Sequence, residues 1–251
     1  MPLLRSIAPV PAWMARASLV LLCLLAAGPP VASATAPGRN GRIAFLGEHC
    51  GSRAIFTIRD DGSRARRVSR GACRSREAVN PSWSPHGRRI LFFQYPGFVV
   101  ADDDGSDARG FTEPVSEGRA YRAEWAPGGS ELAWSFSRGD FDGVFIGTRR
   151  DRQSRFLEEG LSPSWSPNGR SIAMLVPDDT DGCGRAIAIF NASTGARRRT
   201  ILAGSDARYG CAVPRSLDWS PSGRWILFAS AGSTLDLIRP DGTDRRRVKV
   251  R

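Results

Sequence analysis

Two carboxylic acids occupy equivalent positions in a repeated motif of this sequence. Glu124 stands directly before a tryptophan in "EWAPGG", and Asp218 does so in "DWSPSG". Two carboxyl groups about 5 to 10 Å apart can hydrolyse a glycosidic bond, because one serves as the acid and the other as the nucleophile or base. The two other copies of the motif have Ser82 and Ser164 at this position. Two acids among four equivalent positions are close to the number expected by chance.

Other catalytic signatures are absent from the sequence. There is no GxSxG nucleophile elbow, HExxH motif, P-loop or dinucleotide fingerprint. His49 and His86 are the only histidines and the cysteines are widely spaced, so we expect neither a metal centre nor a cofactor. The acidic stretches "DDDGSD" from Asp102 and "PDDTDG" from Pro177 have oxygen atoms that suit calcium. The first falls on a turn that the repeat itself requires, which favours a structural role, and the second lies in an insertion.

Four tryptophan-containing segments organise the chain. They read "SWSPHGRRILF" from Ser82, "EWAPGGSELAW" from Glu124, "SWSPNGRSIAM" from Ser164 and "DWSPSGRWILF" from Asp218. The tryptophans are 42, 40 and 54 residues apart, a period typical of propellers and other repeat arrays. In each copy, Pro and Gly predict a tight turn between a strand that ends at the tryptophan and an apolar second strand.

Third and fourth strands follow the second strand in each copy. The third strands are "FVV" from Phe98, "VFI" from Val144, "IAI" from Ile187 and "LDL" from Leu235. In most copies an Asp-Gly or Thr-Gly turn leads into an arginine-rich fourth strand. Upstream, "NGRIAF" from Asn40, "IFTI" from Ile55 and "RRVSR" from Arg66 fit the last three strands of another copy. Because sheets with two apolar faces must cover one another, the sequence predicts an all-β propeller of about five four-stranded antiparallel blades, the first without a clear inner strand.

The "WSPxG…IxF…DG" repeats resemble the TolB-like, WD-like β-propeller repeats of bacterial extracytoplasmic proteins, over about residues 38 to 250. The same repeat also forms the lid of prolyl oligopeptidase-like enzymes. The resemblance therefore implies a fold and a habit of binding, and it leaves the function open.

The first 34 residues predict a secretory signal peptide. Two arginines, Arg5 and Arg16, precede or flank the apolar run "ASLVLLCLLAAG", and Ala32-Ser33-Ala34 offers the small residues that a signal peptidase requires. The run of 12 residues is shorter than the roughly 20 that span a membrane. An uncleaved N-terminal anchor is the alternative. We expect residues 1–34 to be the signal, and residues 35–251 to form a secreted or periplasmic propeller domain without a transmembrane segment.

Four cysteines follow the signal and allow three pairings. Cys50 and Cys183 lie between the second and third strands of their copies, whereas Cys73 and Cys211 follow the fourth strands. In an up-and-down blade both connections emerge on the same rim. The sequence therefore predicts the disulfides Cys50 to Cys73 and Cys183 to Cys211, which fit an oxidising compartment.

Aromatic and charged residues gather where each fourth strand passes into the next inner strand. Such connections converge on the central channel of a propeller, so we expect them to bind a protein, a peptide or an envelope glycan. Exposed loops also carry such residues without a function, which is the alternative. The candidates are Arg76, Tyr121, Arg122, Glu124, Tyr209, Arg215 and Asp218, with Glu77 beside the first.

The chain has a formal net charge of +11, and its arginines form runs. The runs "SRARRVSR", "ARRRT" and "DRRRVKVR" fall on predicted fourth strands. Charges on an outer strand block edge-to-edge pairing of sheets, which is the favoured interpretation. Attraction to an anionic wall polymer or an anionic lipid surface is the alternative. Nucleic acid is disfavoured by export and by the lack of aromatic stacking residues within the runs.

These features favour a non-catalytic binding or scaffold module of the cell envelope. The alternative is a glycoside-processing enzyme that uses Glu124 and Asp218 as carboxylates of a propeller channel.

Export and disulfide pairing are testable on one sample. Protein isolated from the envelope or the medium is expected to begin after Ala34 and to contain the two disulfides within repeats. N-terminal sequencing and non-reducing peptide mapping check both. A chain that retains its first 34 residues would support the anchored alternative, and pairing between repeats would contradict the alignment of strands.

Overall fold

The computed structural model describes residues 41–71, 77–111, 119–148, 154–178, 184–202, 205–206, 210–211, 214–230 and 234–248. All of them belong to the unit Ala34–Arg251, one of two units into which the chain divides. Their regular structure consists of strands alone. In this part of the chain there is thus no helix that is long and apolar enough to cross a membrane.

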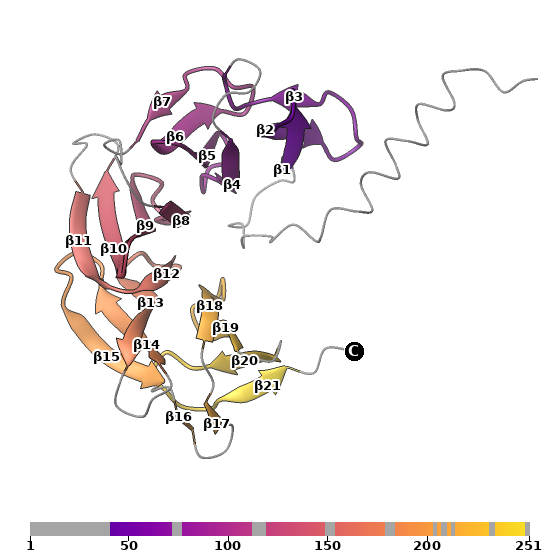
Figure 1. The fold of residues 1–251 in the computed structure, drawn as a ribbon. Coiled ribbons are helices and arrows are strands. Elements are labelled where there is room, and N and C mark those ends of the chain that lie inside the picture. Colours follow the sequence, from indigo (N-terminus) through magenta and orange to yellow (C-terminus); the bar gives the residue numbers. More distant parts are fainter. Residues whose placement is uncertain are drawn as a thin grey trace, which may run out of the picture. The chain divides into compact units, whose positions relative to one another are not determined.

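The strands form an all-β propeller of five antiparallel sheets, within which consecutive strands of the chain are neighbours (Figure 1). The first sheet comprises β1 (Arg42–His49), β2 (Ser52–Arg59) and β3 (Arg66–Arg67). The second comprises β4 (Ala78–Trp83), β5 (Arg89–Gln94), β6 (Gly97–Asp102) and β7 (Arg109–Gly110). The third comprises β8 (Arg119–Trp125), β9 (Glu131–Arg138), β10 (Phe141–Thr148) and β11 (Ser154–Glu159).

The last two sheets repeat this pattern. The fourth comprises β12 (Leu161–Trp165), β13 (Ser171–Asp178), β14 (Gly184–Asn191) and β15 (Arg197–Leu202). The fifth comprises β18 (Pro214–Trp219), β19 (Ile226–Ser230), β20 (Thr234–Ile238) and β21 (Arg246–Val248). In the connection between them, β16 (Ser205–Asp206) pairs with β17 (Gly210–Cys211) as a separate small hairpin. The strands predicted from the repeats are thus confirmed.

The turn after each tryptophan has the same hydrogen bonds in every copy. In the second sheet, the Gly87 amide donates to the carbonyl of Ser84 at 2.9 Å, and the Ser84 amide donates to the carbonyl of Arg89 at 2.8 Å. The glycine of this turn has a φ of 64°, in the left-handed region that side chains resist. Equivalent bonds close the turns of the third, fourth and fifth sheets, so the predicted Pro-Gly turns are confirmed.

Apolar side chains fill the space between neighbouring sheets. Strand β13 shows why, since the six residues from Ser171 to Val176 are all buried. Ile172 and Met174 join the core that the fourth sheet shares with the third, whereas Ala173 and Leu175 join the core shared with the fifth. Because successive side chains of a strand point to opposite faces, a continuous apolar run buries both faces of its sheet. Similar cores join the first sheet to the second and the second to the third.

The strands that carry the tryptophans contact one another in succession. β4 contacts β8, β8 contacts β12, and β12 contacts β18. These four are the innermost strands of their sheets, so residues at equivalent positions of β8, β12 and β18 come close together. The cysteine pairing stays a prediction, because Cys73, Cys183 and the side chain of Cys211 lie outside the described residues.

A substitution at the junction of β11 and β12 should test the packing of the fourth sheet. Gly160 has a φ of 148°, and a Cβ there would lie 2.0 Å from the carbonyl oxygen of Leu175. Gly160→Ala is therefore expected to lower the free energy of unfolding by about 3 kcal/mol. Gly128→Ala, where a Cβ meets no atom within 4 Å, should change it by less than about 0.5 kcal/mol. Urea unfolding measures both, and equal effects would contradict the close approach at Gly160.

Candidate functional site

Four polar residues of the inner strands form the central cluster: Arg122 and Glu124 on β8, Ser164 on β12 and Asp218 on β18. The alternation along β8 places them. Ala123 and Trp125 pack in the core shared with the second sheet, so Arg122 and Glu124 leave the strand on its opposite side. Ser164 and Asp218 each stand directly before the tryptophan of their repeat, as Glu124 does.

An ion pair joins the third sheet to the fifth. Arg122 donates from Nη2 to Oδ1 of Asp218 and from Nη1 to the carbonyl oxygen of Leu217, the latter at 3.5 Å. The side chains of Arg122 and Asp218 are 22% and 33% exposed, so the pair is partly open to solvent. Residues 96 positions apart in the sequence are thereby linked.

Glu124 places a buried carboxyl group beside this pair. The hydroxyl of Ser164 donates to Oε1 of Glu124 at 3.4 Å. Oε2 is buried and has no hydrogen-bond partner among the described residues. Burial raises the pKa of Glu124 to about 8; the neighbouring Arg122 opposes the rise, and the charge of Asp218 adds to it. At neutral pH the carboxyl group of Glu124 is therefore mostly protonated.

Further hydrogen bonds link neighbouring inner strands at the tryptophans and at the residues directly before them. The indole Nε1 of Trp125 donates to the carbonyl oxygen of Ser82 at 3.4 Å. The amide of Trp219 donates to the hydroxyl of Ser164 at 3.2 Å, and that hydroxyl in turn contacts Glu124. The inner strands of the second to fifth sheets are thus joined by polar contacts as well as by packing.

The structure brings together three of the predicted site residues, Arg122, Glu124 and Asp218. Arg215 lies on β18 and is exposed. Tyr121 lies on β8, but its side chain is outside the described residues, as are Arg76 and Tyr209 altogether. Glu77 accepts two hydrogen bonds from the guanidinium of Arg53, at 2.9 and 2.6 Å, and so belongs to a contact with β2.

Two features differ from the sequence-based expectation. The inner strand β8 begins at Arg119, so Tyr121, Arg122 and Glu124 are strand residues and not part of a connecting loop. Ser164 belongs to the cluster, although the sequence analysis did not name it as a site residue. Its position in the repeat, equivalent to those of Glu124 and Asp218, could have indicated its place in the cluster.

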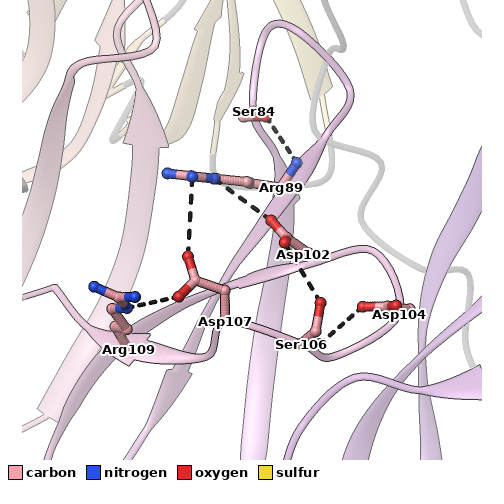
Figure 2. Close-up of polar contacts among 7 residues, drawn as sticks. All are labelled: Ser84, Arg89, Asp102, Asp104, Ser106, Asp107 and Arg109. Carbon is pink, nitrogen blue, oxygen red and sulfur yellow. Dashed lines mark hydrogen bonds and ion pairs between the residues drawn. The ribbon is translucent and has the colours of Figure 1, made fainter.

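The acidic turn of the second sheet has a different role from the central cluster. Figure 2 shows the carboxylates of Asp102, Asp104 and Asp107 in contact with nearby donors. The side chain of Ser106 lowers the pKa of Asp104, and so does the Ser106 amide, which donates to Asp104 at 2.8 Å. Asp107 accepts from Nε of Arg109 at 2.6 Å, and Arg89 lies 3.6 Å from Asp102.

These contacts assign a structural role to the "DDDGSD" turn. Each acid either closes the turn or balances an arginine of a neighbouring strand. Among the described residues, no group of three or more His, Cys, Asp or Glu side chains could hold a metal ion. The second acidic stretch, from Pro177, lies partly outside the described residues.

Comparisons with solved structures agree with the propeller fold. TolB from Acinetobacter baumannii matches with a TM-score of 0.62 and 15% identity, over 84% of this chain and 54% of that one. A nidogen–laminin complex matches with a TM-score of 0.63 and 12% identity, over 84% of this chain and 76% of the matched one. Oligogalacturonate lyase in complex with manganese matches with a TM-score of 0.65 and 12% identity, over 83% of this chain and 62% of the lyase chain.

The chain is thus an all-β propeller built from sequential antiparallel sheets. Within that class its fold is TolB-like, in agreement with the resemblance of the repeats. It spans only about half of the TolB chain that it matches. No protein-family model and no curated protein sequence matches it.

Glu124 should make the stability of the protein depend on pH. Its folded pKa of about 8 lies above the ordinary value of 4.5. Between these two values the unfolded chain binds fewer protons than the folded one. The stability contributed by this group is therefore fully present below about pH 4.5 and is lost as the pH rises towards 8, by up to about 1.4 kcal/mol per pH unit.

The side chain of glutamine cannot ionise, so the variant Glu124→Gln does not lose stability in this way. Its free energy of unfolding relative to that of the wild type should therefore be higher at pH 8 than at pH 5. Urea unfolding at both pH values measures the difference. Glu159→Gln, which changes an exposed carboxylate on β11, is the matched control and should follow the wild type. If both variants follow the wild type, Glu124 is not buried as described.

Proposed function

We propose that this protein is a non-catalytic binding module of the cell envelope, and that its partner contacts the central cluster and the exposed residues beside it. The partner is a protein, a peptide or an envelope glycan. The envelope location rests on the predicted signal peptide and on the TolB-like fold.

The observation that carries this proposal is the ion pair between Arg122 and Asp218. A carboxylate that acts as a nucleophile or base must reach the substrate, but Asp218 already accepts a hydrogen bond from Arg122. The other candidate, Glu124, has one oxygen in contact with Ser164 and the other buried. Asp218 and one oxygen of Glu124 thus already take part in contacts between sheets, which favours binding over catalysis.

The same residues offer binding groups to a polar partner. Arg122 and Asp218 keep part of their side chains exposed, and Arg215 on the same strand as Asp218 is exposed. Charged groups that are held in place by a rigid sheet need little reordering when a partner binds, which favours recognition. The nidogen–laminin complex has a similar fold at 12% identity and supports only the use of this fold in protein binding.

A second candidate function is glycoside processing, favoured by one specific observation. The environments of Glu124 and Asp218 differ: burial raises the pKa of Glu124 to about 8, whereas Asp218 faces the guanidinium of Arg122. Glycosidic hydrolysis uses two carboxyl groups in different environments, one of which is held protonated as the acid. The likeness to oligogalacturonate lyase concerns the fold alone.

The two candidates predict different results in one experiment. The mature protein is screened against immobilised glycans and peptides, in parallel with an assay for cleavage of the same glycans. We expect binding without turnover. Arg215→Gln should weaken binding several-fold, because it removes one exposed charged contact. Arg224→Gln, at an exposed turn of the same sheet, is the control and should leave binding unchanged.

Variants of the two acids separate binding from catalysis. Turnover that is abolished by Glu124→Gln and also by Asp218→Asn would overturn the binding proposal in favour of the enzyme. Binding that survives Arg215→Gln unchanged would place the partner elsewhere on the protein.

A further inference from the structure

The outer strand of the fourth sheet carries three consecutive arginines, Arg197, Arg198 and Arg199, which we call the β15 arginines. All three are exposed, as is Thr200 after them. β15 is the last strand in its sheet, so no described strand pairs with its outer edge. The arginines therefore stand at an open edge of the propeller.

Two of the β15 arginines have no charge partner within the described residues. Arg197 lies 3.6 Å from Glu158 of β11, and its guanidinium lies over the ring of Phe190, 5.5 Å from the centroid. Arg198 and Arg199 form no ion pair and no side-chain hydrogen bond with any residue that the structure describes. Their positive charges are thus uncompensated locally.

In a similar run of the fifth sheet, by contrast, every arginine has a carboxylate partner. Arg246 lies 2.7 Å from Asp244. Arg245 and Arg247 lie 3.3 and 3.2 Å from Asp236, whose side chain is fully buried. These arginines stabilise their own sheet. The two runs have the same three letters in the sequence, but among the described residues only the β15 run contains arginines without a carboxylate partner, Arg198 and Arg199.

The register of β15 spreads its arginines around the edge. Arg197 is paired with Phe190 and Arg199 with Ile189, and the register shifts between the two pairs, so that Arg198 is an extra residue. Phe190 packs towards the third sheet, whereas Ile189 packs towards the fifth. Since the side chains of paired residues lie on the same face of a sheet, the side chains of Arg197 and Arg199 leave the strand on opposite faces.

This arrangement favours a chain-like partner over a flat one. A planar lipid surface would meet only the guanidinium groups of one face, whereas a flexible polymer can follow the edge and meet both. Three successive residues of a strand span about 7 Å, so closely spaced anions suit them. Guanidinium groups bind both phosphate and carboxylate through paired hydrogen bonds. The net charge of +11, or +9 once Arg5 and Arg16 are removed with the predicted signal, adds long-range attraction for an anion.

We propose that the β15 arginines bind a linear polyanion, a polymer with phosphate or carboxylate groups along its chain. The site is independent of the central cluster and of the partner proposed there. Protection of the sheet edge is compatible with this role, because charged side chains at an open edge prevent pairing with another strand whether or not a ligand is bound.

The test uses the mature protein with fluorescent polyphosphate and fluorescent polyglutamate. Wild-type protein is expected to bind at least one of them, with an affinity that falls as salt is raised. The double substitution Arg198→Gln and Arg199→Gln should weaken that binding about tenfold, the loss expected for two cationic contacts with an anionic partner. Preference for one polymer identifies the anion.

The matched control is the double substitution Arg88→Gln and Arg224→Gln. It removes the same charge from two exposed turns, where neither side chain has a described partner, and should weaken binding less than twofold. Circular dichroism and urea unfolding verify that both double variants are folded. Equal losses of affinity in the two double variants would show that only the net charge of the protein matters, and would overturn the proposal. Absence of binding to both polymers, or binding to phosphatidylglycerol vesicles with the same dependence on Arg198 and Arg199, would overturn it too.

Discussion

The structure depends on one constraint, the burial of apolar sheet faces against neighbouring sheets. In β13 the run from Ser171 to Val176 leaves no residue exposed, so this sheet needs a neighbour on either side. Consecutive sheets satisfy the need in turn and form four separate cores. The same packing aligns the inner strands, which brings Glu124 to Ser164 and Arg122 to Asp218. The central cluster is therefore a product of core packing and not of any local motif.

Most of the fold could be predicted from the sequence because its signals are local. Pro and Gly after each tryptophan specify a turn within a few residues, and the apolar triplets on either side specify strands. The limits of β8 were harder to predict, since its sequence "RAYRAEW" alternates poorly between apolar and polar residues. The central cluster could be predicted only as a set of candidates. The contact of Arg122 with Asp218 and the raised pKa of Glu124 depend on how sheets far apart in the sequence approach one another.

The arginine runs show a second limit of sequence reasoning. "RRR" occurs in the fourth and in the fifth sheet. In the fifth, Asp236 of β20 lies opposite Arg247 of β21 and is buried, which draws Arg245 and Arg247 to it. In the fourth, the residues opposite the run are Ile189 and Phe190, which offer no carboxylate. The partner strand thus decides whether an arginine finds a carboxylate, and composition does not show it.

The strictly sequential order of strands has a consequence for how the chain folds. Every described pairing within the five sheets joins strands that are adjacent in the sequence. Each sheet can therefore form from contacts of short sequence separation, with a small loss of loop entropy, before the next sheet exists. Folding that proceeds from the N-terminus sheet by sheet covers the newest apolar face each time another sheet forms. Such a route limits the surface through which unfinished chains aggregate.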